Sequence, residues 1–434
     1  MAVSKKEEIM NRIYGKTMIK TVEKALKAAE RIGGKSGLNC IAELSTTAQE
    51  ETKILEESNA KELPLYGVPI LVKDNIDVKG LHTTAGSMAL EDNVARKDAP
   101  VIRNLRKNGA IILGKTNMTE FANHVTQGMP GGYSSLGGQV IHAINPKVNP
   151  SGSSSGSAVA VSAGIVPMAV GTDTSFSIIA CAQTNGICGL KPPVGTLSDE
   201  GIVPIARTLD SAGPMARNFS DTLKLYSAMR EEPFSEVEPA SFHELRIAVN
   251  QANCSMVSSG QTKFLNKVLR RLQKYGATVD ELEQMPTPYL KTIMKWEFKP
   301  MLEAYLKNST ASRKTLAEIV EYYEKNPETM MKYGDLYLRA SLDETPGGLQ
   351  GVEYLEAMSH RDKMIHTVTT EIAPYDAVIM TGPTNIMHFC GLPSVTVAGK
   401  RKNEFGVKRA LIMYGADEYR LYSATLALEV ILNT

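Results

Sequence analysis

Apolar residues follow two different periods along this chain, and together the two periods predict alternating helices and strands. Helical spacing, with an apolar residue at every third or fourth position, predicts helices at residues 5–32, 38–58, 98–109, 220–226, 261–275 and 424–432. Asp98 is the expected N-cap of the third helix. Short apolar runs predict buried strands at residues 68–72, 111–113, 165–170, 245–250, 277–279, 375–380, 394–397 and 410–414. This alternation is typical of an α/β fold.

One long region departs from the alternation. Residues 287–372 are almost entirely helical in pattern, with a Pro-Gly-Gly break at 346–348. We expect this region to form a helical cap and the far wall of a pocket. Packing is the favoured role for its adaptable methionines, although a lid would also suit Met294, Met301, Met330 and Met331.

Composition excludes several classes of protein. A formal net charge of +1 gives no bias toward polyanions, so we expect no nucleic-acid partner. The five cysteines are scattered without a Cys-x-x-Cys pair, which predicts neither a disulfide framework nor a zinc site and favours a reducing compartment. No apolar run approaches roughly 18 residues, and no apolar segment follows the charged N-terminus. We therefore expect a cytoplasmic protein with no membrane partner.

Serine and glycine gather at both ends of residues 149–193, around an apolar middle. A Gly/Ser-rich loop at 151–157 precedes small residues at 158–163, which predict a helix capped by a serine side chain. The strand at 165–170 then leads into a polar turn at 171–177. We expect the backbone amides of this turn to converge on an anion or a developing oxyanion.

These residues resemble the core of the amidase signature family of serine hydrolases. In that family a Gly/Ser-rich loop carries a bridging serine, and the nucleophile follows 24 positions later in a Gly-Thr-Asp-Thr-Gly-Gly-Ser turn. The spacing here is 177 − 153 = 24, which places Ser153 at the bridging position and Ser177 at the nucleophile. The family's lysine lies in a Gly-Val-Pro-x-x-x-Lys-Asp segment, which residues 67–74 match with Lys73 as the candidate base. The resemblance is strong over about residues 40–230.

The resemblance implies amide hydrolysis through an acyl-enzyme, with no cofactor and no metal. Lys73 must be neutral to act as the base, so burial must lower its pKa from about 10.4 by roughly three units. A cis peptide bond between Gly152 and Ser153 would let the bridging serine reach both partners. Ser154 and Asp173 are the expected supporting residues. The oxyanion would be held by the backbone N–H groups of Thr174, Ser175, Phe176 and Ser177.

The resemblance also implies a particular fold, an α/β domain built on a large twisted mixed β-sheet with helices on both faces. We expect one domain over residues 1–434. Within it we expect N-terminal helices at 1–60, a signature core at 61–230 and the helical cap at 287–372. The expected ligand is a small-molecule amide, and a homodimer is left open.

The chain departs from the family pattern around the nucleophile. Ser175-Phe176 replaces the family's Gly-Gly, Ile178-Ile179 replaces its usual Ile-Arg, and Cys181 lies where proline is common. We expect Phe176 to place a large ring beside the oxyanion turn and to narrow the acyl pocket. A positive φ at this position would also be unfavourable for any residue but glycine.

Two other motif matches are rejected. Residues 109–116 fit the P-loop pattern, but a helix precedes the first glycine and strand-like residues replace the flexible loop. Residues 152–156 fit Gly-x-Ser-x-Gly, but no strand precedes them as a nucleophile elbow requires. No histidine has a convincing catalytic motif, and structural roles are expected for His82, His124 and His388.

The predicted function is hydrolysis of a carboxylic amide to an acid plus ammonia or an amine. Segments 132–140, 209–221 and 296–305 look more like peptide-amidase-type members than the glutamine-hydrolysing subunit of a tRNA-dependent amidotransferase. That subunit, which works with obligatory partner subunits, is the alternative enzyme. A catalytically impaired amidase-fold binding protein is the alternative from a different class, because Ser175-Phe176 replaces Gly-Gly.

Overall fold

The computed structural model describes residues 18–58, 60–250, 259–283, 287–380 and 384–434. The first part of the helix predicted at 5–32 lies outside these residues, as does Cys254. The strands are β1 (Ile41–Leu44), β2 (Pro69–Lys73), β3 (Ile111–Thr116), β4 (Tyr133–Ser134), β5 (Gly138–Gln139), β6 (Met168–Asp173), β7 (Cys188–Lys191), β8 (Ser211–Ala216), β9 (Arg246–Asn250), β10 (Thr278–Leu282), β11 (Ala377–Met380), β12 (Ser394–Lys402) and β13 (Lys408–Tyr414).

The α-helices of the described residues differ widely in length. They are α2 (Met18–Ala28), α3 (Ala48–Ser58), α4 (Pro100–Lys107), α5 (Ser155–Ser162), α6 (Ile179–Asn185), α7 (Phe219–Met229), α9 (Ser259–Lys274), α10 (Leu290–Asn308), α11 (Leu316–Lys325), α12 (Pro327–Met330), α13 (Leu336–Asp343), α14 (Val352–Ile372), α15 (Ile386–Phe389) and α16 (Glu418–Asn433). Short turns of other helical types are η1 (Ala29–Gly33), η2 (Met88–Leu90), η3 (Glu120–Asn123) and η4 (Gly348–Gln350).

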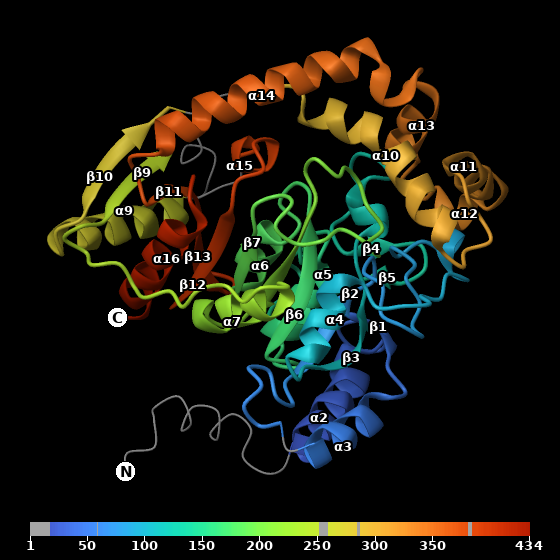
Figure 1. Cartoon of the computed structure of the whole chain (residues 1–434), viewed down its shortest axis with the longest axis horizontal. Coiled ribbons are helices and arrows are strands. Elements are labelled where there is room, and N and C mark those ends of the chain that lie inside the picture. Colours follow the sequence, from blue (N-terminus) through green and yellow to red (C-terminus); the bar gives the residue numbers. More distant parts are fainter. Residues whose placement is uncertain (1–17, 59, 251–258, 284–286, 381–383) are drawn as a thin grey trace.

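A mixed sheet of eleven described strands forms the centre of the molecule, in the order β1-β3-β2-β6-β8-β7-β12-β13-β11-β9-β10 (Figure 1). Parallel pairs lie toward both ends, with β3, β2 and β6 on one side and β11, β9 and β10 on the other. Antiparallel pairs join the two groups through β8, β7, β12 and β13. The predicted α/β fold with a large mixed sheet is confirmed.

Different helices cover the two faces of the sheet, because successive strand residues point to opposite sides. On β2, Leu71 packs in the core that contains α5, α6 and the helices α10 and α14. Its neighbours Ile70 and Val72 face the other way and pack with α4 and α7. Farther along this second face, α9 and α16 cover the sheet. Lys73, two residues after Leu71, therefore lies on the α5 side of the sheet.

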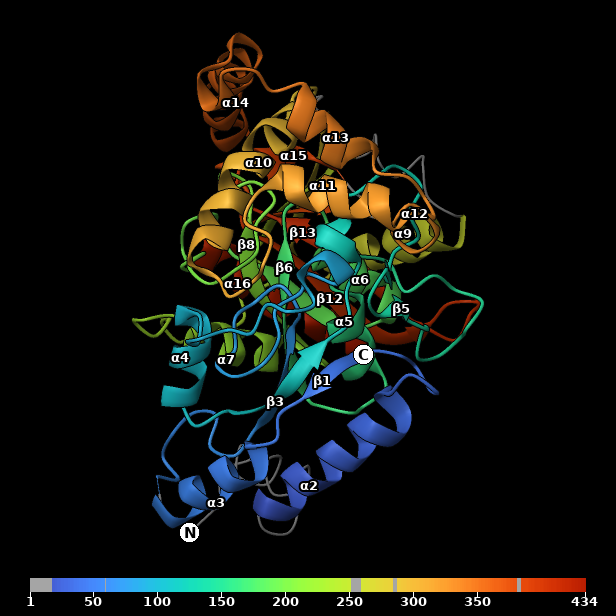
Figure 2. The ribbon, with the colours of Figure 1, turned by 90° about the vertical axis from the view of Figure 1, so that its right-hand side faces the viewer.

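Helices α10 to α14 form a group that stands apart from the strands (Figure 1). The long helix α14 runs over the top of the view, from the side of α10 and α13 toward the side of β9 and β10, and leads in the chain to β11. At the opposite pole, α2 and α3 lie side by side below β1 and β3 (Figure 2). None of the helices in the described part of the chain combines the length and apolar character that a membrane span requires.

The helix predicted at residues 38–58 is wrong in its first half. Residues 41–44 form the edge strand β1, which pairs antiparallel with β3, and helix α3 begins only at Ala48. Pairing with a distant strand overrides the local helical pattern, because a strand edge satisfies the backbone hydrogen bonds of this short segment equally well.

Two predicted helix caps are also wrong. Ser154 precedes α5 but makes no capping bond, because its hydroxyl donates to the Thr172 carbonyl at 3.0 Å. Ala99, not Asp98, is the residue that precedes α4. The Asp98 carboxylate instead accepts from the backbone N–H of Lys79 at 2.7 Å. In both cases a tertiary hydrogen bond takes the side chain away from the helix end.

Candidate active site

The predicted base, Lys73, is the last residue of β2, which lies parallel to β6. Carboxyl ends of parallel neighbours meet at one edge of a sheet, so Lys73 comes beside Thr172 near the end of β6. Residues 171–173 were expected in the polar turn, but they are the last residues of this strand. A strand end holds both side chains firmly in place.

The predicted bridging residue, Ser153, lies in the loop just before α5 and is fully buried. The peptide bond between Gly152 and Ser153 is cis, as the resemblance implies. Gly152 packs closely against Thr119, and a Cβ atom at position 152 would overlap the Thr119 hydroxyl. A larger residue there would push the loop away from β2 and β6.

The three residues predicted as catalytic lie in one continuous chain of hydrogen bonds. Lys73 Nζ lies 2.7 Å from Ser153 Oγ, and Ser153 Oγ lies 3.0 Å from Ser177 Oγ. Lys73 and Ser153 have no exposed surface, whereas Ser177 is 5% exposed. The chain of contacts therefore leads from a buried amine to a hydroxyl that solvent can reach.

Two residues that the sequence reasoning missed fix the position of the amine. Lys73 Nζ donates to the Thr172 carbonyl at 3.2 Å and to the Thr172 hydroxyl at 2.8 Å. Asn75 Nδ2 donates to the same hydroxyl at 3.0 Å and to the Val203 carbonyl at 3.2 Å. Thr172 and Asn75 lie within two residues of Asp173 and Lys73, but their roles depend on contacts between strands that no local pattern shows.

Burial controls the charge of this amine. Desolvation lowers the pKa of the Lys73 ammonium to about 7, against opposing interactions with Cys181, Asp173 and Asp210. The decrease matches the roughly three units that the sequence argument required. Near neutral pH a large fraction of Lys73 is therefore an uncharged amine.

The two predicted supporting residues both contact the segments that carry the serines. Asp173 Oδ2 accepts from the backbone N–H groups of Ile178 and Ile179, at 2.7 and 3.1 Å, at the start of α6. Ser154 Oγ donates to the Thr172 carbonyl and accepts from the Thr172 N–H at 3.3 Å. Ile179, where the family has arginine, is fully buried in the core.

A cavity of about 590 Å³ opens at Ser177. Gly152, Thr174 and Ser175 line its inner side. Its far wall belongs to α10 and α13, as predicted for the cap, and includes Leu290, Lys291, Met294, Leu336 and Tyr337. This volume and mixed lining are typical of a small-molecule site.

Phe176 does not behave as the sequence argument expected. Its φ is +71°, and its N–H donates to Nε2 of His388 at 3.2 Å, so this N–H is not directed at an oxyanion. The Phe176 ring packs edge-on against the His388 ring, with centroids 4.3 Å apart. Phe176 is not among the described residues that line the cavity, so the expected narrowing of the acyl pocket finds no support in the cavity lining. The expected oxyanion group is thereby reduced to the amides of Thr174, Ser175 and Ser177.

Asp210 is another residue that the sequence reasoning missed. The Thr174 hydroxyl donates to Asp210 Oδ1 at 2.5 Å, and the backbone N–H groups of Ile205 and Ala206 donate to Oδ2 at 2.8 and 3.1 Å. Desolvation nevertheless raises the pKa of the Asp210 carboxyl to about 7. This carboxyl anchors the turn that precedes Ser177.

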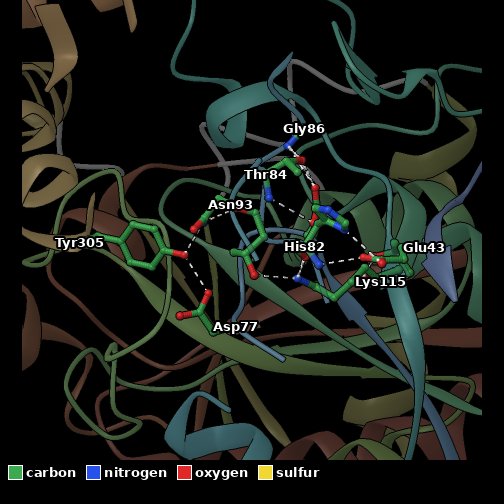
Figure 3. Close-up of polar contacts among 12 residues, drawn as sticks. Glu43, Asp77, His82, Thr84, Gly86, Asn93, Lys115 and Tyr305 are labelled. Carbon is green, nitrogen blue, oxygen red and sulfur yellow. Dashed lines mark hydrogen bonds and ion pairs between the residues drawn. The ribbon is translucent and has the colours of Figure 1, made fainter. Parts of the chain in front are cut away.

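A second buried polar cluster surrounds Lys115 of β3, in the segment that follows β2 (Figure 3). Lys115 Nζ lies 3.5 Å from Asp74 Oδ1 and donates to the His82 carbonyl at 2.7 Å. Burial opposes charge on both groups, since it lowers the pKa of Lys115 and raises that of Asp74. Lys115 belongs to the rejected P-loop match, and its place inside β3 confirms that rejection.

The other two predicted structural histidines have partners other than Ser153 and Ser177, although His124 lines the same cavity as Ser177. His82 Nδ1 lies 3.1 Å from Glu43 Oε1, and His124 Nε2 lies 3.1 Å from Ser341 Oγ. Within the ranges that the structure describes, no three histidine, cysteine or carboxylate side chains are grouped as metal ligands.

Comparison with known proteins agrees with this geometry. The model of the amidase family matches residues 20–392. A probable amidase of Arabidopsis thaliana is 30% identical over 393 residues, which cover 83% of this chain and 76% of that protein. A glutamyl-tRNA(Gln) amidotransferase chain of Exiguobacterium sibiricum is 32% identical over 393 residues, covering 84% and 78%. The solved peptide amidase of Stenotrophomonas maltophilia superposes with a TM-score of 0.86 at 27% identity, covering 98% of this chain and 95% of that one.

The chain belongs to the amidase signature family, and it is a hydrolase of carboxylic amides. This assignment supports an enzyme over the binding-protein alternative.

Replacing Asp210 by asparagine tests the electrostatics of the turn. Asparagine keeps the shape, and its oxygen at the Oδ2 position still accepts from the N–H groups of Ile205 and Ala206, while its NH2 group donates to the Thr174 hydroxyl instead of accepting from it. It has no charge to desolvate. The carboxyl pKa is raised from 3.8 to about 7 in the folded chain, so wild-type stability falls as the pH rises from 3.8 through about 7. We therefore expect Asp210→Asn to stabilise the protein more at about pH 8 than at about pH 5. Denaturation midpoints of both proteins at the two pH values measure this difference, and an equal effect at both would contradict it.

Proposed function

We propose that this amidase works through an acyl-enzyme on Ser177, with Ser153 as a proton relay and Lys73 as the base. The observation that carries the proposal is the unbroken path of 2.7 and 3.0 Å contacts from Lys73 Nζ to Ser177 Oγ at the cavity. A serine hydroxyl is a poor nucleophile until a positioned base removes its proton. The path supplies that base through one intervening hydroxyl.

The partners of Lys73 account for the direction of proton transfer. A neutral amine has two N–H groups and one lone pair. The Thr172 carbonyl can only accept, and the Thr172 hydroxyl receives a second N–H. The lone pair is then left for the Ser153 hydroxyl at 2.7 Å. Ser153 in turn accepts the proton of Ser177 when the nucleophile attacks.

The reaction then proceeds in two halves. Ser177 Oγ attacks the carbonyl carbon of the amide, and its proton passes through Ser153 to Lys73. The Lys73 ammonium returns a proton through Ser153 to the leaving nitrogen, which departs as ammonia or an amine. Water in the cavity hydrolyses the ester on Ser177 by the same relay, and the acid leaves.

Backbone amides of the turn stabilise the negative charge that develops on the carbonyl oxygen. The N–H groups of Thr174, Ser175 and Ser177 serve this role, while that of Phe176 is committed to His388. Ser154 and Asp173 keep the two loops in register through their bonds to Thr172 and to the start of α6. No cofactor enters any of these steps.

The cavity favours an amide that carries a sizeable apolar group. Leu290, Met294 and Leu336 supply apolar surface to a far wall that also carries Lys291, Lys295 and Glu344, and about 590 Å³ is more space than a small polar amide needs. This supports a small-molecule or peptide amide, in line with the likeness to a peptide amidase. The likeness of the chain to an amidotransferase component supports glutamine as the second candidate.

The buried thiols support the expected reducing compartment. Cys40, Cys181, Cys188 and Cys390 are all free and buried, which suits a protein that works in the cytoplasm.

The pH dependence of kcat/KM tests the role of Lys73. Only the neutral amine accepts a proton, so activity falls about tenfold per pH unit below the Lys73 pKa of about 7. Asp210→Asn is the matched control, because Asp210 also has a pKa of about 7. We expect Asp210→Asn to keep the acidic limb, moved to lower pH because the Asp210 carboxylate raises the Lys73 pKa, and Lys73→Arg to lose activity at every pH. An acidic limb that disappears in Asp210→Asn would contradict the assignment.

A panel of amides separates the two substrate candidates. We expect a peptide amide with an apolar side chain to exceed glutamine in kcat/KM by about tenfold or more, because one buried apolar side chain contributes about 1.5–3 kcal/mol. Met294→Ser, which makes the far wall polar, should reduce the preference. Comparable rates on glutamine, together with co-purification of partner subunits, would favour the amidotransferase reading instead.

A further inference from the structure

The residue before the nucleophile has a backbone conformation that its side chain disfavours. Phe176 has a φ of +71°, in the left-handed region where a Cβ atom crowds the neighbouring carbonyl oxygen. The family pattern has glycine at this position, and glycine adopts such angles at no steric cost. Surrounding contacts must therefore hold Phe176 in place here.

His388 supplies contacts to both the main chain and the side chain of Phe176. It belongs to the short helix α15 and is fully buried. Its Nε2 accepts the Phe176 N–H at 3.2 Å, and its ring meets the Phe176 ring edge-on at 75°, with centroids 4.3 Å apart. An edge-on aromatic pair of this kind adds to the hydrogen bond.

The other nitrogen of His388 faces the opposite end of the same turn. Nδ1 lies 3.4 Å from Asp173 Oδ1, while Asp173 Oδ2 accepts from Ile178 and Ile179. A backbone N–H can only donate, so Nε2 must be the unprotonated nitrogen and the ring proton resides on Nδ1. Neither Nδ1 nor Asp173 Oδ1 has a hydrogen-bond partner among the described residues, so the imidazole holds residue 176 by a hydrogen bond and meets residue 173 by proximity alone.

Burial favours the neutral form of the His388 ring. Burial lowers the pKa of His388 to about 4, with Asp173 acting against the decrease and Lys191 adding to it. At neutral pH the ring therefore keeps an acceptor nitrogen for Phe176.

We propose that His388 is a positioning residue, which holds the left-handed Phe176 and so keeps Ser177 Oγ on Ser153 and the remaining turn amides toward the cavity. The proposal rests on the catalytic role proposed above for Ser177. Neither His388 nor Phe176 is among the described residues that line the cavity. The pair therefore acts on the turn and not on a bound substrate. His388 thus stabilises at position 176 the positive φ that the glycine of the family pattern adopts without such support.

A double-mutant cycle between the two positions tests this coupling. In His388→Asn the shorter side chain places its amide group near the position of Nδ1, so no acceptor remains for the Phe176 N–H. In His388→Gln the longer side chain places a carbonyl oxygen near the position of Nε2. We expect His388→Asn to lower kcat about 10- to 100-fold with KM changed less than about twofold, and His388→Gln to recover part of the loss. In a Phe176→Gly background, where φ needs no support, the loss should shrink to less than about threefold. An equal loss in both backgrounds, or an equal rise in KM, would overturn the proposal.

The tautomer of His388 can be measured without any substrate. Long-range ¹H–¹⁵N spectra of histidine-labelled wild-type protein should show His388 with its proton on Nδ1 at neutral pH. A proton on Nε2 would overturn the proposal, because that nitrogen could not then accept from Phe176. A failure of the proposed function would give a different result from a failure of this proposal, because Ser177→Ala would then retain the amidase activity of the wild type.

Discussion

The active site depends on one buried amine. Lys73 has no exposed surface, and desolvation brings its pKa to about 7, so that near neutral pH a large fraction of it carries a free lone pair. A lysine in water, with a pKa of about 10.4, would be almost fully protonated near pH 7 and could not accept a proton. Its contacts with Thr172 and Ser153 satisfy the amine in the interior without a fixed countercharge within ion-pair distance among the described residues. Burial destabilises the ammonium form of Lys73 and thereby favours the neutral amine, which is the form proposed to act as the base.

The sheet positions this amine relative to the two serines. Strands β2 and β6 are parallel neighbours, so Lys73 and Thr172 reach the same edge of the sheet. The loop before α5 then places Ser153 against Lys73, and the turn after β6 brings Ser177 to Ser153. The cap helices α10 and α13 add the far wall of the cavity. Lys73 therefore lies on a strand, whereas Ser153 and Ser177 lie in short segments directly before α5 and α6, and the connection between the three side chains is short.

Much of this arrangement is predictable from the sequence, because family motifs identify Lys73, Ser153 and Ser177 at fixed spacing. The alternation of periods also predicts the α/β fold, whereas the edge strand β1 is missed because its pairing partner is distant in sequence. Thr172 is missed for the same reason, and for His388 the sequence predicts a structural role but not its contact with Phe176. They act through contacts between segments, as the Phe176 N–H that donates to His388 shows. Local sequence patterns identify side chains with suitable chemistry, but they do not show which backbone groups form hydrogen bonds between segments that are distant in the sequence.

Covalent labelling with a fluorophosphonate tests the central claim most directly, since this probe reacts with serines that a base has activated. Intact mass and peptide mapping of the wild type should show a single adduct on Ser177. Lys73→Ala and Ser177→Ala, each checked for folding, should both lose that adduct. An adduct on another residue, full labelling of Lys73→Ala, or a folded wild type that takes no label would contradict the Lys73–Ser153–Ser177 relay.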